Sequence, residues 1–142
     1  MSKALATLIK LAHHKVDKVQ KDLASLRNVM QALDADMIEL EREVRDGGAL
    51  AVRMEDPSIM AQAAAFAGRA KIMMDALKER RVACEVQEQE QLVLLAEHFS
   101  AQKRYETLQM RQQHVAKRAY EAKIQKALDE AAGVSWSAEG VL

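Results

Sequence analysis

Apolar residues recur along the first third of the chain at alternating intervals of three and four positions. The most regular run consists of Val16, Val19, Leu23, Leu26, Met30, Leu33, Met37, Leu40 and Val44. The same spacing extends backwards through Leu5, Ile9 and Ala12. An interval that averages 3.5 residues places every member on one face of a helix and indicates a left-handed coiled coil. The pattern predicts one long helix over about residues 3–45.

Glycine and proline mark where this helix should end and where a second should begin. Gly47 and Gly48 follow the last apolar position, and glycine is favoured just past a helix end. Asp56 and Pro57 then supply a capping side chain and a residue suited to the first helical position. No further proline follows, and the next helix-ending signal is Gly133. We predict a connection at about 46–56, a second helix at about 57–132 and a flexible tail at 133–142.

The second predicted helix carries a weaker heptad pattern. Its clear members are Ile59, Ala63, Phe66, Ala70, Met73 and Leu77. The register continues through Arg80, Cys84, Gln87, Gln91, Leu94 and His98, and then through Ala101, Tyr105, Leu108, Gln112, Val115, Ala119 and Ala122. Leu92, Leu95 and Phe99 fall outside it. We therefore expect the seam to shift near these three residues.

Two such helices predict an all-α fold, an antiparallel coiled-coil hairpin that forms a single domain over residues 1–132. With a connection of about a dozen residues, the sequence numbers of two residues that face each other across the hairpin would add up to about 103. That pairing sets Leu40 beside Ala63 and brings Leu5 near His98. The second helix is the longer one. We expect about thirty of its residues, those after His98, to overhang the N-terminus.

The composition supports a helical protein and excludes an all-β fold. Of the 142 residues only 4% are aromatic and one is proline, whereas a β-sandwich or barrel needs many aromatic, β-branched and turn residues. The 21 basic and 21 acidic residues cancel, but unevenly, because residues 98–128 hold seven basic and two acidic side chains. This positive block falls on the predicted overhang, where the hairpin offers no opposing charge.

No residue pattern is typical of an enzyme, a metal centre or a cofactor site. The chain has no glycine-rich phosphate loop or nucleophile motif, and His13 and His14 are adjacent, so they diverge by about 100° on a helix. Cys84 is the single cysteine, and we expect it to fill the seam. No apolar run approaches the ~20 residues that a membrane helix needs. We expect a cytoplasmic protein without catalytic activity, cofactor or small-molecule substrate.

The cations of the overhang are the main candidate binding residues. They are Lys103, Arg104, Arg111, Lys117, Arg118, Lys123 and Lys126. Clustered cations can bind nucleic-acid phosphates, but these are spread around the helix and no base-reading motif accompanies them. The same residues would suit insertion into an acidic protein channel, or a solvated helix surface. Met54 and Met60 near the turn form a second candidate contact, since flexible thioethers adapt to partner surfaces.

The opening Lys3-Ala4-Leu5-Ala6-Thr7-Leu8-Ile9-Lys10-Leu11, followed by Val16, Leu23 and Leu26-Arg27, resembles the start of the FliJ family of flagellar export proteins. The later stretches 105–113 and 119–131 are similar to the C-terminal helix of that family. Length and hairpin layout match as well. The resemblance covers most of the chain.

The resemblance implies a non-enzymatic stalk or general chaperone of the flagellar type III export apparatus, which serves motility and chemotaxis. Such a protein binds the hexameric export ATPase, the export-gate membrane protein and export chaperones, and associates peripherally with the inner membrane. The side of the termini, with its seven cations, is implied to meet the ATPase. The implied gate contact comprises Leu40, Phe66, Ala70, Met73 and Leu77. Several of these are core residues in the predicted seam, and Glu43 and Gly47 stand where family members can carry tyrosines.

Three other functions fit the same features. The equivalent stalk of an injectisome type III secretion system would share the same physics. A basic nucleic-acid-binding coiled coil would use the cations, and its affinity would fall as salt rises. A generic adaptor would dimerise through the seam as an extended rod, whereas the stalk predicts a monomeric hairpin.

Overall fold

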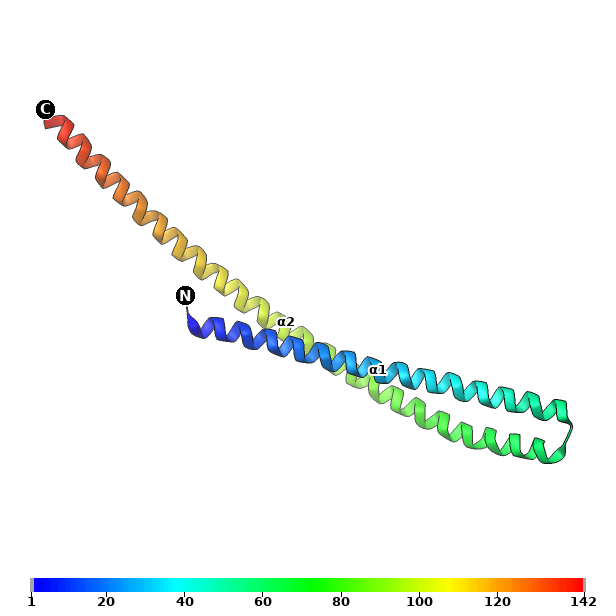
Figure 1. Ribbon diagram of the computed structural model, residues 1–142. Helices are drawn as coiled ribbons and strands as arrows, with labels where there is room; N and C mark the ends of the chain where they lie inside the picture. Colours follow the sequence, from blue (N-terminus) through cyan, green and yellow to red (C-terminus); the bar gives the residue numbers. More distant parts are fainter. Residues whose placement is uncertain (1, 142) are drawn as a thin grey trace. The chain divides into compact units, whose positions relative to one another are not determined.

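Two long α-helices make up the fold in the computed structural model, which describes the backbone of residues 2–141 and the side chains of residues 2–134. Helix α1 spans Lys3–Met54 and helix α2 spans Pro57–Val141 (Figure 1). The helices pack against each other, and no strand occurs between residues 2 and 141. The predicted all-α helical hairpin is confirmed. Its contacts divide into two units, Val16–Glu97 and Met1–Lys15 with His98–Leu142, which are described in turn.

Helix α1 does not end at Gly47 and Gly48, so the predicted end near residue 45 is wrong. The heptad spacing continues past Val44 through Gly47 to Ala51, and Ala51 is buried. Neither glycine has a positive φ, so neither acts as a helix cap. A glycine inside a helix costs about 1 kcal/mol relative to alanine. Packing of Ala51 and its neighbours outweighs that cost.

The connection between the helices is only Glu55 and Asp56, so the predicted eleven-residue connection at 46–56 is also wrong. Glu55 has a φ of 51°, in the left-handed region that reverses the chain. Asp56 Oδ1 accepts a hydrogen bond from the Ser58 N–H at 2.8 Å, and Pro57 is the first helical residue. The predicted start of the second helix is therefore confirmed, together with its cap.

Helix α2 continues past Gly133 to Val141, so the predicted helix end at residue 132 and the flexible tail at 133–142 are wrong over 133–141. Leu142 lies outside the described residues. Gly133 keeps a helical backbone, and a Cβ placed on it would meet nothing within 4 Å. Glycine marks a helix end only where it takes the left-handed conformation.

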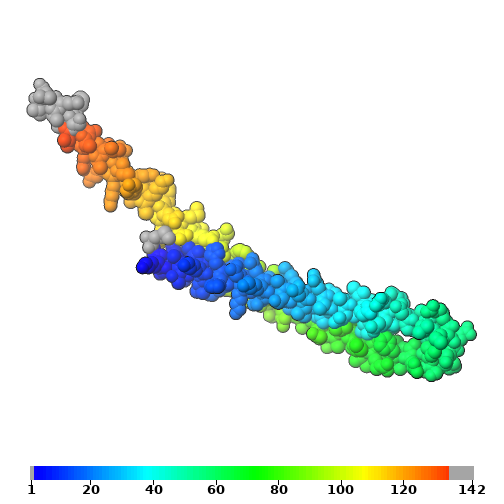
Figure 2. Space-filling model, in the orientation of Figure 1, coloured from blue at the N-terminus to red at the C-terminus, as the bar shows by residue number. Residues whose placement is uncertain are grey.

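The unit Val16–Glu97 contains most of the core. Every predicted seam residue of α1 from Val16 to Val44 is buried or half-buried there. On α2 the positions 63, 70, 77, 84 and 91 are covered as predicted. The other predicted seam positions of α2 are exposed: 73, 80, 87 and 94. The residue that follows each of them in the sequence is covered instead, namely Met74, Arg81, Glu88 and Leu95. The face that α2 presents to α1 is thus rotated from the predicted one. Figure 2 shows the side chains of α1 and α2 in contact along this unit.

The pairing of the two helices differs from the predicted pairing. Arg27 pairs with Glu88 and Asp34 pairs with Arg81, and both pairs of numbers add to 115 rather than 103. The difference arises because the connection has two residues instead of a dozen. Leu40 therefore does not face Ala63.

The unit Met1–Lys15 with His98–Leu142 packs the start of α1 on α2. Leu5 and Ala12 are buried, and His13 Nε2 lies 3.3 Å from Glu106 Oε1. On α2 the last half-buried residue is Gln109, and every side chain described from Met110 to Val134 is exposed. The uncovered stretch of α2 thus begins near residue 110, not after His98 as predicted.

Candidate functional site

Two ion pairs join the helices beside the seam of the unit Val16–Glu97, and their α2 members, Arg81 and Glu88, are half-buried. Arg81 Nε donates to Asp34 Oδ1 at 2.9 Å, and Arg81 Nη1 donates to Glu85 Oε1 at 3.2 Å. The hydrogen bond to Asp34 raises the pKa of Arg81 above its ordinary value. One heptad away, Arg27 Nε donates to Glu88 Oε2 at 3.2 Å with the opposite polarity. The two pairs therefore alternate in sign along the hairpin.

This alternation favours the observed register over slips of one heptad. A slip of one heptad in one direction would bring Arg27 beside Arg81, and a slip in the other would bring Asp34 beside Glu88. Both slips place like charges together, whereas the observed register neutralises both pairs. Charged and polar residues at coiled-coil seams set register in this way.

The implied gate residues are partly gathered around Leu40. Two shallow grooves flank this side chain: Ala70 lines one, and Met73 and Leu77 line the other. Leu40 and Ala70 are only 6% and 3% exposed, so they are core residues, while Met73 is 53% exposed. Phe66 is half-buried and lines neither groove. Of the five, Met73 is the side chain that offers a substantial surface.

The seven predicted cations all lie on α2 and are all exposed. Lys103, Arg104 and Arg111 line one open groove together with Tyr105 and Leu108. The four that follow, Lys117, Arg118, Lys123 and Lys126, lie on the uncovered stretch of the helix. The structure thus does not bring the seven into one site. It places four of them where α2 has no covering helix.

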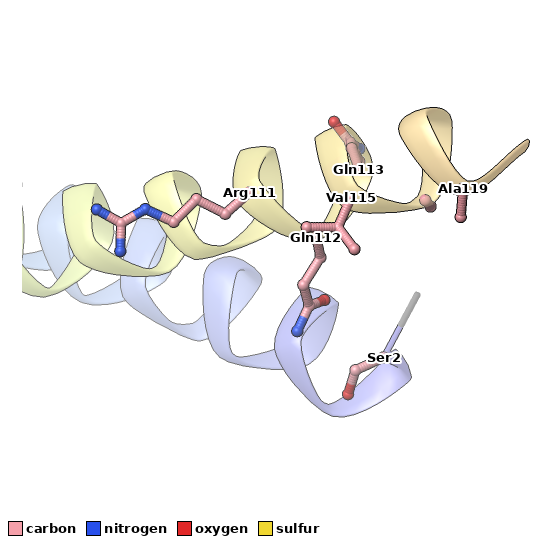
Figure 3. Close-up of a pocket in the computed structure, with 7 residues that line it drawn as sticks. Ser2, Arg111, Gln112, Gln113, Val115 and Ala119 are labelled. Carbon is pink, nitrogen blue, oxygen red and sulfur yellow. The ribbon is translucent and has the colours of Figure 1, made fainter. Parts of the chain in front are cut away.

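An apolar groove opens where α1 begins and α2 runs on (Figure 3). Ser2 lies at its α1 side and caps that helix, because its Oγ accepts the Leu5 N–H at 3.3 Å. From α2 the groove is lined by Arg111, Gln112, Gln113, Val115, Ala116 and Ala119. Sequence reasoning missed it because the predicted register placed the N-terminus near His98.

The end of the hairpin exposes a second group of apolar side chains. Leu50, Val52 and Met54 precede the connection, Met60 follows it, and all four are exposed. The expectation that Met54 and Met60 face a partner stays a prediction, although both are accessible to one.

The described side chains offer no sign of a metal centre or a membrane span. Residues 2–134 contain no group of three or more His, Cys, Asp or Glu residues placed to hold a metal ion. Within the described residues neither helix has an apolar stretch long enough to cross a membrane. Cys84 is a free, half-buried thiol on the seam, as expected of a core filler.

The fold and these surfaces define a two-helix antiparallel coiled coil. No protein-family model matches the chain, and no curated protein or solved structure matches it either.

Proposed function

We propose that this chain is a non-enzymatic stalk of a flagellar type III protein export apparatus, which binds the export ATPase ring and links it to the export gate. The proposal rests on the resemblance to the FliJ family and on one structural observation. Helix α2 continues from Met110 to Val134 with every side chain exposed, and residues 110–126 carry five cations and one acid before Asp129 and Glu130 follow. A single positive helix of this kind suits an acidic opening in a ring.

In this proposal the two ends of the molecule have different partners. The exposed cations Lys117, Arg118, Lys123 and Lys126 meet the ATPase ring. The groove beside Leu40, with Met73 at its surface, meets the export gate. Export chaperones are further partners, and the protein acts in the cytoplasm, peripherally associated with the inner membrane. Coupling requires that the ring bind the stalk differently in its different states.

The test uses the full chain and the export ATPase encoded in the same genome. We expect the chain to bind the ATPase and to raise its rate of ATP hydrolysis. A Lys117→Glu/Arg118→Glu variant should lose most of both effects, because it reverses two exposed charges. The matched control is Lys18→Glu/Lys21→Glu, which reverses two exposed charges on α1 within the unit Val16–Glu97. Absence of binding and of stimulation by the wild-type chain would refute the proposal.

Two alternatives are separated by simple measurements. The cations also favour a nucleic-acid-binding coiled coil, which requires measurable affinity for RNA or DNA at low salt. An adaptor that dimerises through its seam requires twice the mass of one chain in light scattering. The equivalent stalk of an injectisome would bind the ATPase of that system in preference to the flagellar one.

A further inference from the structure

Three glycines stand inside the two helices near the end of the hairpin. Gly47 and Gly48 belong to α1, and Gly68 belongs to α2. None of them has a positive φ, so none forms a turn or a helix cap. A Cβ on any of them would meet nothing within 4 Å, so none is needed to let the helices approach closely. The property of glycine that remains is a backbone that leaves the helical conformation easily.

The glycines of the two helices lie at nearly the same level of the hairpin. The residue numbers in the two cross-helix ion pairs of the unit Val16–Glu97 each add to 115, and those of Gly47 and Gly68 add to the same number. At the connection, Glu55 and Asp56 add to 111. The difference is four residues, so Gly47 and Gly68 lie within about one helical turn of each other. This match matters because a hairpin bends only where both helices bend, and one straight helix would splint the other.

The part of the hairpin beyond the glycines, residues 49–67, is called the tip and is held together less firmly than the rest of the unit (Figure 1). Ala51 is its one buried side chain, and its other covered side chains are half-buried. Between residues 16 and 40 the buried side chains are larger: Val16, Val19, Leu23, Met30, Leu33 and Leu40. Among the side chains described, 2–134, the cross-helix ion pair nearest to the connection is Asp34 with Arg81. Segments with little apolar burial and few cross-links move at low cost in free energy.

We propose that the three glycines form a hinge at which the tip bends relative to the rest of the unit Val16–Glu97. The tip carries four exposed apolar side chains: Leu50, Val52, Met54 and Met60. Bending changes the direction in which these side chains face, while the seam from Val16 to Val44 stays paired. The hinge follows from the chain's own backbone, so it needs no partner and does not depend on the proposed function.

The test compares two pairs of spin labels on the full chain by pulsed electron paramagnetic resonance, in a Cys84→Ala background. Labels at the exposed residues Val29 and Val52 of α1 span the hinge. Labels at the exposed residues Ile72 and Val93 of α2 span a similar length of helix that contains no glycine. In the wild type we expect a broader distance distribution for the first pair than for the second.

The hinge variant is Gly47→Ala/Gly48→Ala/Gly68→Ala. It should narrow the distribution of the first pair to the width of the second, because alanine holds the helical conformation more firmly than glycine. Hydrogen exchange of the backbone amides at 47–52 and 64–68 should slow by roughly tenfold or more. The matched control is Gly133→Ala, which fills another open, helical glycine outside this unit and should change neither measurement. Circular dichroism should show that both variants remain helical.

Three results would overturn the hinge. Equal widths for the two label pairs in the wild type would show that the tip does not bend. A broad first distribution that persists in the hinge variant would show that the glycines are not its cause. An equal narrowing by Gly133→Ala would show that the stiffening is not local to the tip. None of these measurements involves the export ATPase, so the hinge and the proposed function are tested separately.

Discussion

Arg81 of α2 and Asp34 of α1 are joined by a 2.9 Å hydrogen bond, and Arg81 stands at a seam position of α2 that is ordinarily apolar. The Arg81 side chain is 25% exposed, so the pair is partly withdrawn from water. The guanidinium of Arg81 is charged throughout the physiological pH range, and the hydrogen bond to Asp34 raises its pKa further, so its contribution would be lost only as pH rises through that raised pKa.

The first prediction concerns the register of the two helices. The double variant Asp34→Arg/Arg81→Glu reverses both charges of the pair, so the observed contact is preserved. Both α1 members of the two ion pairs are then arginines, at 27 and 34, and both α2 members are glutamates, at 81 and 88. Slips of one heptad would then also join opposite charges. We expect spin labels at the exposed residues Gln20 and Ala96, in a Cys84→Ala background, to give one distance in the wild type and more than one in the exchanged variant. A single unchanged distance would show that packing alone sets the register.

The second prediction concerns the glycines inside α1. A Cβ at Gly48 would meet nothing within 4 Å, and the backbone there is helical. Gly48→Ala should therefore raise the free energy of unfolding by about 0.5–1 kcal/mol. Urea denaturation should show a higher midpoint with an unchanged slope. Gly68 is equally open and helical, so Gly68→Ala is the matched comparison. A loss of stability in Gly48→Ala alone would show that helix α1 needs the flexibility of glycine at residue 48.

The third prediction concerns the two-residue connection. Asp56→Ala removes the cap on the Ser58 N–H and should lower stability by about 1 kcal/mol, while Asp56→Asn should preserve most of it. Glu55→Gly should raise stability by up to about 1 kcal/mol, because Glu55 holds a left-handed backbone conformation that glycine adopts freely. Thermal unfolding followed by circular dichroism measures all three variants. Equal stability of Asp56→Ala and the wild type would show that the cap is dispensable.

The fourth prediction concerns a polar seam residue. Oε1 of Gln91 is buried, and no group among the described residues donates a hydrogen bond to it, which costs stability. Gln91→Leu should raise the free energy of unfolding by about 1 kcal/mol, since it removes that cost and adds apolar burial. The neighbouring exposed Gln89→Leu is the control and should have little effect. Similar gains at both positions would mean that helix propensity, rather than the seam, explains the change.

The fifth prediction separates core from surface among the implied gate residues. Leu40→Ala should destabilise the hairpin by about 2–4 kcal/mol, because Leu40 is buried. Met73→Ser should leave stability nearly unchanged but weaken binding to the export gate, because its side chain is accessible. Ile72→Ser, at the adjacent and still more exposed position, is the control for binding. Gate affinity that falls equally in both serine variants would argue against the groove beside Leu40.

The seam of α1 was predictable residue by residue because its period is a local property of the sequence. Every predicted position from Leu5 to Val44 is buried or half-buried. The start of α2 was predictable for the same reason, since Asp56 caps the helix with its own side chain. The overhang's cations were also visible in the sequence, and their exposure followed from their charge.

The end of α1 and the register of the two helices were decided only by the tertiary structure. Gly48 could have ended a helix, but the burial of Ala51 carried α1 on to Met54. That extension shortened the connection to two residues and moved every pairing along the hairpin. A heptad pattern alone cannot specify this, because slips of seven residues preserve it. The sequence by itself thus determined which face of α1 is buried, and long-range packing and the pairing of Arg81 with Asp34 determined what that face meets.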